Sequence, residues 1–184
     1  MVLSRSWYGS HSFLNDYILL NKCRMIMEIG VADGENAKRM VIVASNNFSV
    51  EVVEYYGFDL FGWNGDSHMK RVIKKLEATG CKFKLFRGDS TITLPKLVED
   101  LPMMDLIFID GGHSYPTVDS DWENSKNLMH DDTAVFFHNY DFSGPKRVVD
   151  KISRDEYDVK MIYPPSDSTT ALVKKRRVQG KRNE

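Results

Sequence analysis

Short apolar runs alternate with longer amphipathic stretches along most of this chain. The runs are rich in Ile, Phe and Val, which favour strands, and the stretches between them have the length and periodicity of helices. The run DLIFID at 105–110 is continuous, which is typical of a strand buried on both faces. The pattern predicts strands over residues 25–29, 53–59, 82–86, 105–110, 134–138, 157–163 and 170–174, and helices over 36–44, 67–79, 92–100, 117–129 and 145–153.

The order of these elements predicts a single α/β domain over residues 1–184. Repeated strand–helix–strand units require a parallel sheet with helices on both faces. The last two strands are joined only by a short PPSDS connection, so they must be antiparallel to each other. A doubly wound mixed sheet binds ligands beyond the carboxyl ends of its strands, and the residues there are the candidates for function.

The loop after the first strand reads EIGVADGEN. Gly30 and Gly34 allow a tight turn and a close approach of a ligand to the backbone. The acids Glu28, Asp33 and Glu35 would repel a pyrophosphate, so the loop favours a ligand with an ammonium or sulfonium group. A structural turn without any ligand explains this stretch equally well.

The second and third strands each end near a carboxylate. Asp59 could accept hydrogen bonds from two ribose hydroxyls, and Phe61 and Trp63 after it could offer an apolar face to a purine. Asp89 and Ser90 could bind the exocyclic amine of adenine. Both aspartates could instead cap a turn or a helix N-terminus.

The fourth strand leads into the segment FIDGGHSY, the most specific stretch of the chain. Asp110 leaves the buried strand, a double-glycine turn follows, and His113 comes three residues after the carboxylate. A histidine held at the ligand edge of a sheet is well placed for proton transfer, since its pKa moves easily across neutrality. A structural or surface role for His113 is the alternative.

The fifth strand ends in His138, Asn139 and Asp141 and should lie beside the fourth. These three side chains could then converge with Asp110. Carboxylate, imidazole and amide groups can together ligate a divalent ion, with Asp110, His138 and Asn139 as the candidate ligands. A hydrogen-bonded polar cluster without metal is the alternative.

In this order and spacing, the segments EIGVADGEN, FDLF, GDS and FIDGGHSY resemble those of class I S-adenosylmethionine-dependent methyltransferases. IDGGHSY is similar to the small-molecule O-methyltransferase branch that includes the macrocin and mycinamicin sugar methyltransferases. The resemblance implies a Rossmann-like seven-stranded sheet in the order 3-2-1-4-5-7-6, with the last strand antiparallel.

The resemblance also implies roles for individual residues. Asp110 would help to hold magnesium, and His113 would be the general base. At the fifth strand the related enzymes carry two acids or an Asp-Asn pair, whereas this chain has His138-Asn139. The loss of one carboxylate favours a softer transition ion, or no metal, over magnesium. The implied cofactor-binding residues are Glu28, Gly30, Val31, Ala32, Gly34, Asp59, Leu60, Gly88, Asp89, Ser90 and Asp110.

The composition limits the partners of the protein. A formal net charge of -1 over 184 residues argues against nucleic acid, although residues 176–184 form a basic tail that could bind an anion. No apolar run is long enough for a membrane span, and the two cysteines form no close pair, so we expect a cytoplasmic protein with reduced thiols.

The segment 1–24 carries Trp7, Tyr8, Phe13 and Tyr17. These aromatic residues could fold over the cofactor as a lid or pack against the sheet. The chain leaves little room for a substrate domain, so a homodimer partner could supply a wall of the acceptor site.

The sequence therefore predicts transfer of a methyl group to a hydroxyl oxygen of a small molecule, with His113 removing the proton and Asp110 orienting the acceptor. Two other classes stay open. One is a non-catalytic protein that binds S-adenosylmethionine or S-adenosylhomocysteine. The other is an NAD-dependent oxidoreductase, which the acidic first loop disfavours.

Overall fold

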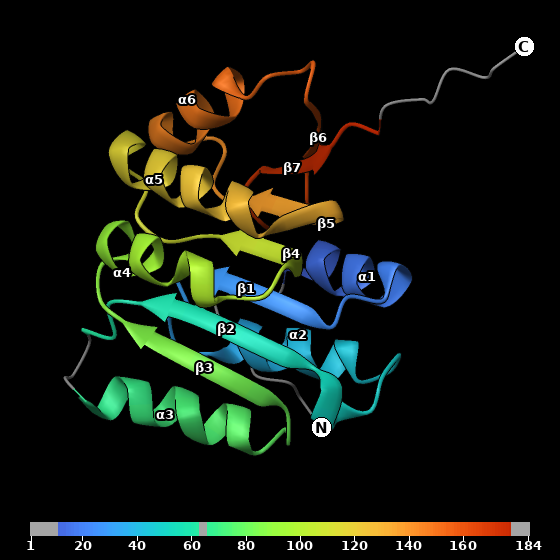
Figure 1. The fold of residues 1–184 in the computed structure, drawn as a ribbon, viewed down its shortest axis with the longest axis vertical. Coiled ribbons are helices and arrows are strands. Elements are labelled where there is room, and N and C mark those ends of the chain that lie inside the picture. The colour runs from blue at the N-terminus through green and yellow to red at the C-terminus, as the bar shows by residue number, and fades with distance from the viewer. Residues whose placement is uncertain (1–10, 63–65, 178–184) are drawn as a thin grey trace, which may run out of the picture.

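One seven-stranded sheet organises the protein, in the order β3-β2-β1-β4-β5-β7-β6 (Figure 1). The computed structural model describes residues 11–62 and 66–177. The strands are β1 (Met25–Ile29), β2 (Glu54–Asp59), β3 (Lys82–Arg87), β4 (Met104–Ile109), β5 (Met129–Phe137), β6 (Tyr157–Ile162) and β7 (Thr170–Lys175). The helices are α1 (Ser12–Asn21), α2 (Glu35–Ala44), α3 (Asp66–Glu77), α4 (Ser90–Leu97), α5 (Tyr115–Ser125) and α6 (Ser143–Lys151).

The pairing of the strands confirms the predicted fold. Strands β1 to β5 are parallel to their neighbours, and β7 runs antiparallel to both β5 and β6. The 163–169 connection is too short for the crossover that a parallel β6–β7 pair would need. The order implied by the resemblance, including the reversed strand, is the observed one.

The register places the ends of the central strands at one level. Ile29 at the end of β1 is paired with both Phe58 of β2 and Ile109 of β4, and Ile109 is paired with Phe137 of β5. The residue that follows each of these paired residues therefore belongs to the same edge of the sheet. That row consists of Asp59, Gly30, Asp110 and His138.

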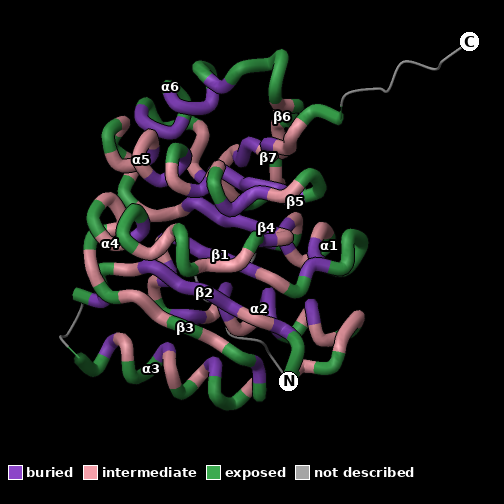
Figure 2. The backbone as a smooth tube through the Cα atoms, viewed as in Figure 1, coloured by how far each residue is buried: buried purple, intermediate pink, exposed green. Residues whose placement is uncertain are grey.

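Each face of the sheet is covered by its own apolar core. On one face α1, α2 and α3 pack against residues such as Ile26, Phe108 and Phe136. On the other face α4, α5 and α6 pack against residues such as Met27 and Phe137. The central strands are accordingly buried, whereas β3 and β6 at the edges are only partly buried (Figure 2). Both cysteines are buried free thiols in the first core.

Helix α1 was not among the predicted elements. Its residues Leu14 and Ile18 are fully buried, and the rings of Phe13 and Tyr17 lie 5.9 and 5.2 Å from that of Phe136. These two aromatic residues thus pack on the sheet rather than over its edge. Trp7 and Tyr8, the other aromatic residues considered for a lid, lie outside the described residues.

The boundary between α5 and β5 also differs from the prediction. The helix ends at Ser125, and β5 begins at Met129, earlier than expected. The first residues of β5 include the exposed Asp131 and Asp132, so no apolar pattern marks them as a strand. They are held instead by pairing of Met129 with Met104, next to an irregularity in the β4–β5 register.

Two further observations concern a membrane and the basic tail. Within residues 11–62 and 66–177, no helix combines the length and apolar character that a membrane crossing requires. At the start of the basic tail, Arg176 pairs with Asp158 at 3.0 Å and Arg177 pairs with Asp132. The rest of the tail, residues 178–184, lies outside the described residues.

Candidate functional site

The loops after β1, β4 and β5 meet at the carboxyl edge of the sheet. The Asp110 amide donates to Ile29 O at 2.8 Å, and the His138 amide donates to Ile109 O at 3.0 Å. Gly30 adopts a φ of +94°, and a Cβ added there would lie 2.2 Å from Asp110 O. Only glycine therefore allows this contact between the two loops.

Asp59 joins the first loop to the second. Its Oδ2 accepts from the Ala32 amide at 3.0 Å, and its Oδ1 accepts from the Phe61 amide at 2.6 Å. Both donors have positive φ values, 48° at Ala32 and 45° at Phe61, which these bonds help to hold. Each carboxylate oxygen keeps a second lone pair, so the turn-stabilising role leaves room for a ribose hydroxyl.

The apolar surface beside Asp59 is not the expected one. Phe61 is fully buried, with its ring 5.5 Å from that of His68, so the expectation that it faces a purine is wrong. Leu60 is 65% exposed and offers the apolar side chain at this position. Trp63 lies outside the described residues.

The acids of the first loop are less open than their sequence suggests. Glu28 is buried, accepts from Asn36 Nδ2 at 2.7 Å and from the Tyr55 hydroxyl, and burial raises its pKa to about 8. Lys75 lies 2.8 Å from Glu35, and its Nζ also donates to Asp33 O at 2.6 Å. Lys75 thus offsets part of the charge of this loop, while the Asp33 side chain is 53% exposed, so the expectation that an acidic loop suits a sulfonium stays a prediction.

The remaining residues of this loop flank Gly30. Val31 is buried, while Ala32 O lies 2.5 Å from His68 Nε2. Gly34 precedes α2, and a Cβ added there would lie 3.0 Å from the Val72 side chain. The loop from Gly30 to Gly34 is thus held against α3 by contacts with His68 and Val72.

At the end of β3, Asp89 caps α4. Its Oδ1 accepts from the Thr91 amide at 2.9 Å and from the Thr91 hydroxyl at 2.7 Å, as the capping alternative predicted. Ser90 is the first residue of α4, and Gly88 precedes the cap with a φ of +141°. Capping uses Oδ1, and Oδ2 forms no hydrogen bond with the residues that the structure describes, so it could accept one from a ligand.

His113 is held by the turn between β4 and α5. Its Nε2 lies 3.7 Å from Asp110 Oδ1, and its ring packs edge-on against Phe142 at 4.9 Å. A Cβ on Gly144 would lie 2.0 Å from His113 O, so the start of α6 packs directly on this turn. The Nε2 atom is buried and has no hydrogen-bond partner among the described residues.

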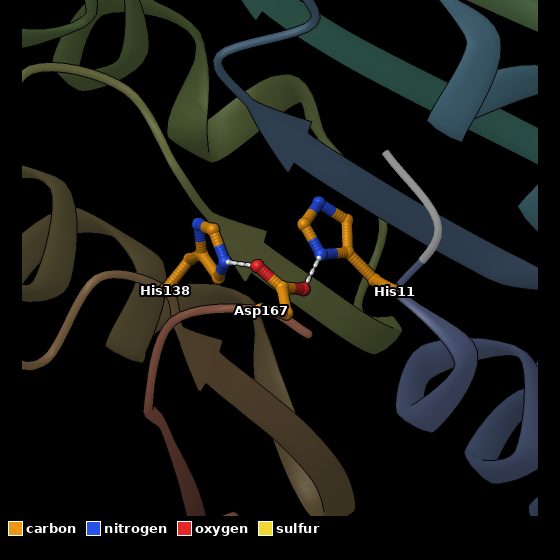
Figure 3. A group of neighbouring side chains, drawn as sticks. All are labelled: His11, His138 and Asp167. Atoms are coloured by element: carbon orange, nitrogen blue, oxygen red, sulfur yellow. Dashed lines mark hydrogen bonds and ion pairs between the residues drawn. The ribbon is translucent and has the colours of Figure 1, made fainter. Parts of the chain in front are cut away.

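A chain of histidines and carboxylates continues from Asp110. His138 Nδ1 lies 2.9 Å from Asp110 Oδ1, and its Nε2 lies 2.9 Å from Asp167 Oδ1. Asp167 Oδ2 in turn lies 2.6 Å from His11 Nδ1 (Figure 3). Asp110 and His138 therefore meet as the sequence predicted, but as part of a larger cluster.

Electrostatics follow from this arrangement. Burial alone would raise the pKa of Asp110, but its contacts with His113 and His138 hold that pKa below the usual value. Burial alone would lower the pKa of His138, but the carboxylates of Asp110 and Asp167 raise it. Burial and the neighbouring His138 lower the pKa of His11.

The other polar residues after β5 serve the β6–β7 connection. Asn139 Nδ2 donates to Ser168 Oγ at 2.9 Å, and Asp141 Oδ2 accepts from the Thr169 amide at 3.0 Å. Asp141 therefore does not converge with Asp110 and His138 as expected. Its carboxylate instead fixes the loop that carries Asp167.

Sequence reasoning missed two members of the cluster. His11 stands before α1, in a segment expected to act as a lid or packing element, and Asp167 lies in the short connection between the last two strands. No local pattern marks either residue. Their contact spans 156 positions of the chain, so only the assembled fold shows it.

Comparisons with known proteins agree with this geometry. A family model described as a methyltransferase domain matches residues 27–140. No curated protein sequence matches the chain as a relative. The O-methyltransferase TomG from Streptomyces achromogenes, solved in complex with SAM, has a TM-score of 0.72 at 15% identity, covering 90% of this chain and 78% of that one.

Two other solved structures are similar to the same extent. The O-methyltransferase from Bacillus cereus, in complex with SAH, has a TM-score of 0.73 at 14% identity, covering 92% of this chain and 83% of that one. CalS11, a TDP-rhamnose 3'-O-methyltransferase of calicheamicin biosynthesis, has a TM-score of 0.73 at 18% identity, covering 89% and 76%. At these identities the solved structures show a shared fold.

The family model covers well over half of the chain and includes the ends of β1 to β5. It thus contains the row of residues that the sheet places at one edge. The resemblance to class I methyltransferases found in the sequence is confirmed. The chain belongs to the family of methyltransferase domains.

Proposed function

We propose that the protein transfers a methyl group from S-adenosylmethionine to a hydroxyl oxygen of a small molecule, with His113 as the general base. The observation that carries the proposal is the place of the His113 imidazole at the ligand edge of the sheet. Its side chain is 37% exposed, so an acceptor can reach the ring, while its buried Nε2 lies 3.7 Å from Asp110 Oδ1. A base must lie within hydrogen-bond reach of the proton that it takes.

The cofactor-binding part of the proposal rests on the first three strand ends. Solved proteins of this fold are described in complex with SAM and with SAH. In this chain the open lone pairs of Asp59 suit ribose hydroxyls, and exposed Leu60 beside them suits a purine face. The loop from Gly30 to Gly34, above Glu28, would line the methionine end, and Gly88, Asp89 and Ser90 would surround the adenine.

The reaction needs little from the protein beyond positioning and one proton transfer. The cofactor supplies a methyl group on a positively charged sulfur. As the acceptor oxygen forms its bond to that methyl carbon, the sulfur–carbon bond breaks and the His113 imidazole takes the hydroxyl proton. Asp110 would orient the acceptor from beside the base, so most of the rate gain comes from holding two reactants in line.

A metal between Asp110, His138 and Asn139 stays a prediction that this geometry disfavours. His138 Nδ1 already contacts Asp110 Oδ1 at 2.9 Å, and the Asn139 amide is bound to Ser168. No step of the proposed reaction depends on an ion there. A cytoplasmic location and a second copy that completes the acceptor site also stay predictions.

Calorimetric titration with S-adenosylmethionine and S-adenosylhomocysteine, followed by a methylation assay on hydroxyl acceptors, tests this function. We expect micromolar binding that Asp59→Ala weakens at least tenfold, because its carboxylate both holds the loop and meets the ribose. Asp141→Ala is the matched control, since Asp141 also accepts a backbone amide but lies in the other half of the edge.

Three outcomes decide between the candidate functions. Binding with turnover supports the enzyme. Binding without turnover on any hydroxyl acceptor supports the non-catalytic alternative. Failure to bind either compound, together with binding of NAD, would overturn the proposal in favour of an oxidoreductase.

A further inference from the structure

We propose that His11, His138 and Asp167 form a binding site for one divalent transition-metal ion, with zinc as the typical occupant. One ligand atom from each residue lies within 4.8 Å of the other two, and the carboxylate stands between the two rings (Figure 3). This site differs from the predicted set of Asp110, His138 and Asn139. It does not depend on the proposed methyl transfer.

The distances already approach those of a coordination sphere. Asp167 Oδ2 lies 2.6 Å from His11 Nδ1, and Asp167 Oδ1 lies 2.9 Å from His138 Nε2. Zinc bonds nitrogen and oxygen at roughly 2.0–2.2 Å, which separates tetrahedral ligand atoms by about 3.4 Å. An ion would therefore require the Asp167 contacts to widen by ~0.8 Å at His11 and ~0.5 Å at His138, with loss of the protons now shared with Asp167.

The surroundings orient the two imidazoles. His138 Nδ1 faces Asp110 Oδ1 at 2.9 Å, which leaves Nε2 directed at the site. A carboxylate on the second ring nitrogen is the usual support of a metal-bound histidine. The His11 ring is fixed by Phe13 and Phe108, at centroid distances of 5.6 and 5.0 Å. Both histidines thus have their ring planes set before an ion arrives.

Burial and ligand type set the expected selectivity. His11 and His138 are only 7% and 8% exposed, whereas the Asp167 side chain is 21% exposed, so water could reach a fourth coordination position from that side. Two imidazoles and one carboxylate suit zinc, cobalt or iron better than magnesium, which prefers oxygen ligands.

The position of the ligands indicates what the ion would do. His11 precedes α1, His138 follows β5, and Asp167 belongs to the β6–β7 connection. One ion would cross-link three segments that come from distant parts of the chain. Because it binds the folded state, it would stabilise the protein against unfolding as its concentration rises above the dissociation constant.

The test is titration of the chelator-treated full chain with Co²⁺, followed by displacement with Zn²⁺ and by a Mg²⁺ comparison. We expect one equivalent of Co²⁺ to bind with visible absorption bands, Zn²⁺ to displace it, and Mg²⁺ to leave the bands unchanged. His11→Gln and Asp167→Asn should each weaken binding by more than the roughly 10- to 100-fold of an outer-shell change. Zn²⁺ should also raise the Tm of the parent protein but not of these variants.

His130→Gln is the matched control. His130 Nε2 also contacts an aspartate, Asp105 Oδ1 at 3.0 Å, but within the described part of the chain no second histidine joins that pair. The control should bind Co²⁺ like the parent protein. Circular dichroism of each metal-free variant checks its fold, and the stoichiometric spectrum of the parent protein needs no variant at all.

Two results would overturn the proposal. One is the absence of a one-equivalent cobalt spectrum in the parent protein. The other is equal loss of binding in His130→Gln and in the two site variants, which would show surface binding only. Either result would leave the proposed methyl transfer standing, since cofactor binding and turnover are measured without added metal.

Discussion

The two halves of the ligand edge are built in different ways. After β2 and β3, Asp59 and Asp89 each bond to a backbone amide two residues further along the chain, and Asp59 also bonds to the Ala32 amide. After β4 and β5, Asp110, His138, Asp167 and His11 instead form a chain of side-chain contacts between residues 28 to 156 positions apart. The first half is thus a fixed scaffold suited to binding, whereas the second half holds groups that can exchange a proton or take a ligand.

The largest expected effect comes from a substitution in the second half of the edge, after β4. His113→Ala should lower kcat by about 10²- to 10⁴-fold, the usual contribution of a general base, and leave cofactor affinity unchanged. Steady-state methylation kinetics with calorimetry check both values. His130→Ala, at the start of β5, is the control. Activity within a few fold of the parent protein would show that His113 does not take the proton.

Gly30→Ala breaks the junction between the halves. The new Cβ would overlap Asp110 O, and the residue would keep an unfavourable positive φ, so we expect a loss of more than about 2 kcal/mol in unfolding free energy. Urea unfolding measures it. Gly62→Ala is the matched control, because no atom of the described residues lies within 4 Å of its added Cβ. Equal stability of the two variants would contradict the close approach of the loops.

Glu28→Gln tests the buried acid beneath the first half. Because its folded pKa of about 8 lies above the usual 4.5, its contribution to stability is full below about pH 4.5 and is lost as the pH rises through 8. The variant lacks this titration, so its free energy of unfolding should not fall in the same way. Relative to the parent protein, it should rise by on the order of 2 kcal/mol between pH 6 and pH 9. Urea unfolding at both pH values checks the gain, and a constant difference would contradict it.

The smallest expected effect comes from removing one helix N-cap in each half of the edge. Asp89→Ala and Ser114→Ala each remove an N-cap side chain, of α4 and of α5, so each should cost about 1 kcal/mol of stability. Only Asp89→Ala should also weaken S-adenosylmethionine binding, as calorimetry can measure. If both variants weaken it equally, Asp89 acts on the fold and not on the adenine.

The same difference between local and long-range contacts explains which features of the fold and the site could be predicted from the sequence. Strands, the reversed last strand and the row of strand-end residues followed from apolar runs and connection lengths, which are local features. The capping role of Asp89 followed for the same reason. Helix α1 was missed, since its burial of Leu14 and Ile18 depends on the sheet and α2 rather than on a strong pattern of its own.

The sequence by itself determined the class of fold, the family and the edge where the site lies, because strand order places Gly30, Asp59, Asp110 and His138 in one row. Only the tertiary structure decided what these residues touch. It enclosed Glu28 and Phe61, turned Asn139 toward Ser168 and brought His11 to Asp167. Such contacts join segments far apart in the chain, and their geometry depends on the packing of every element between them.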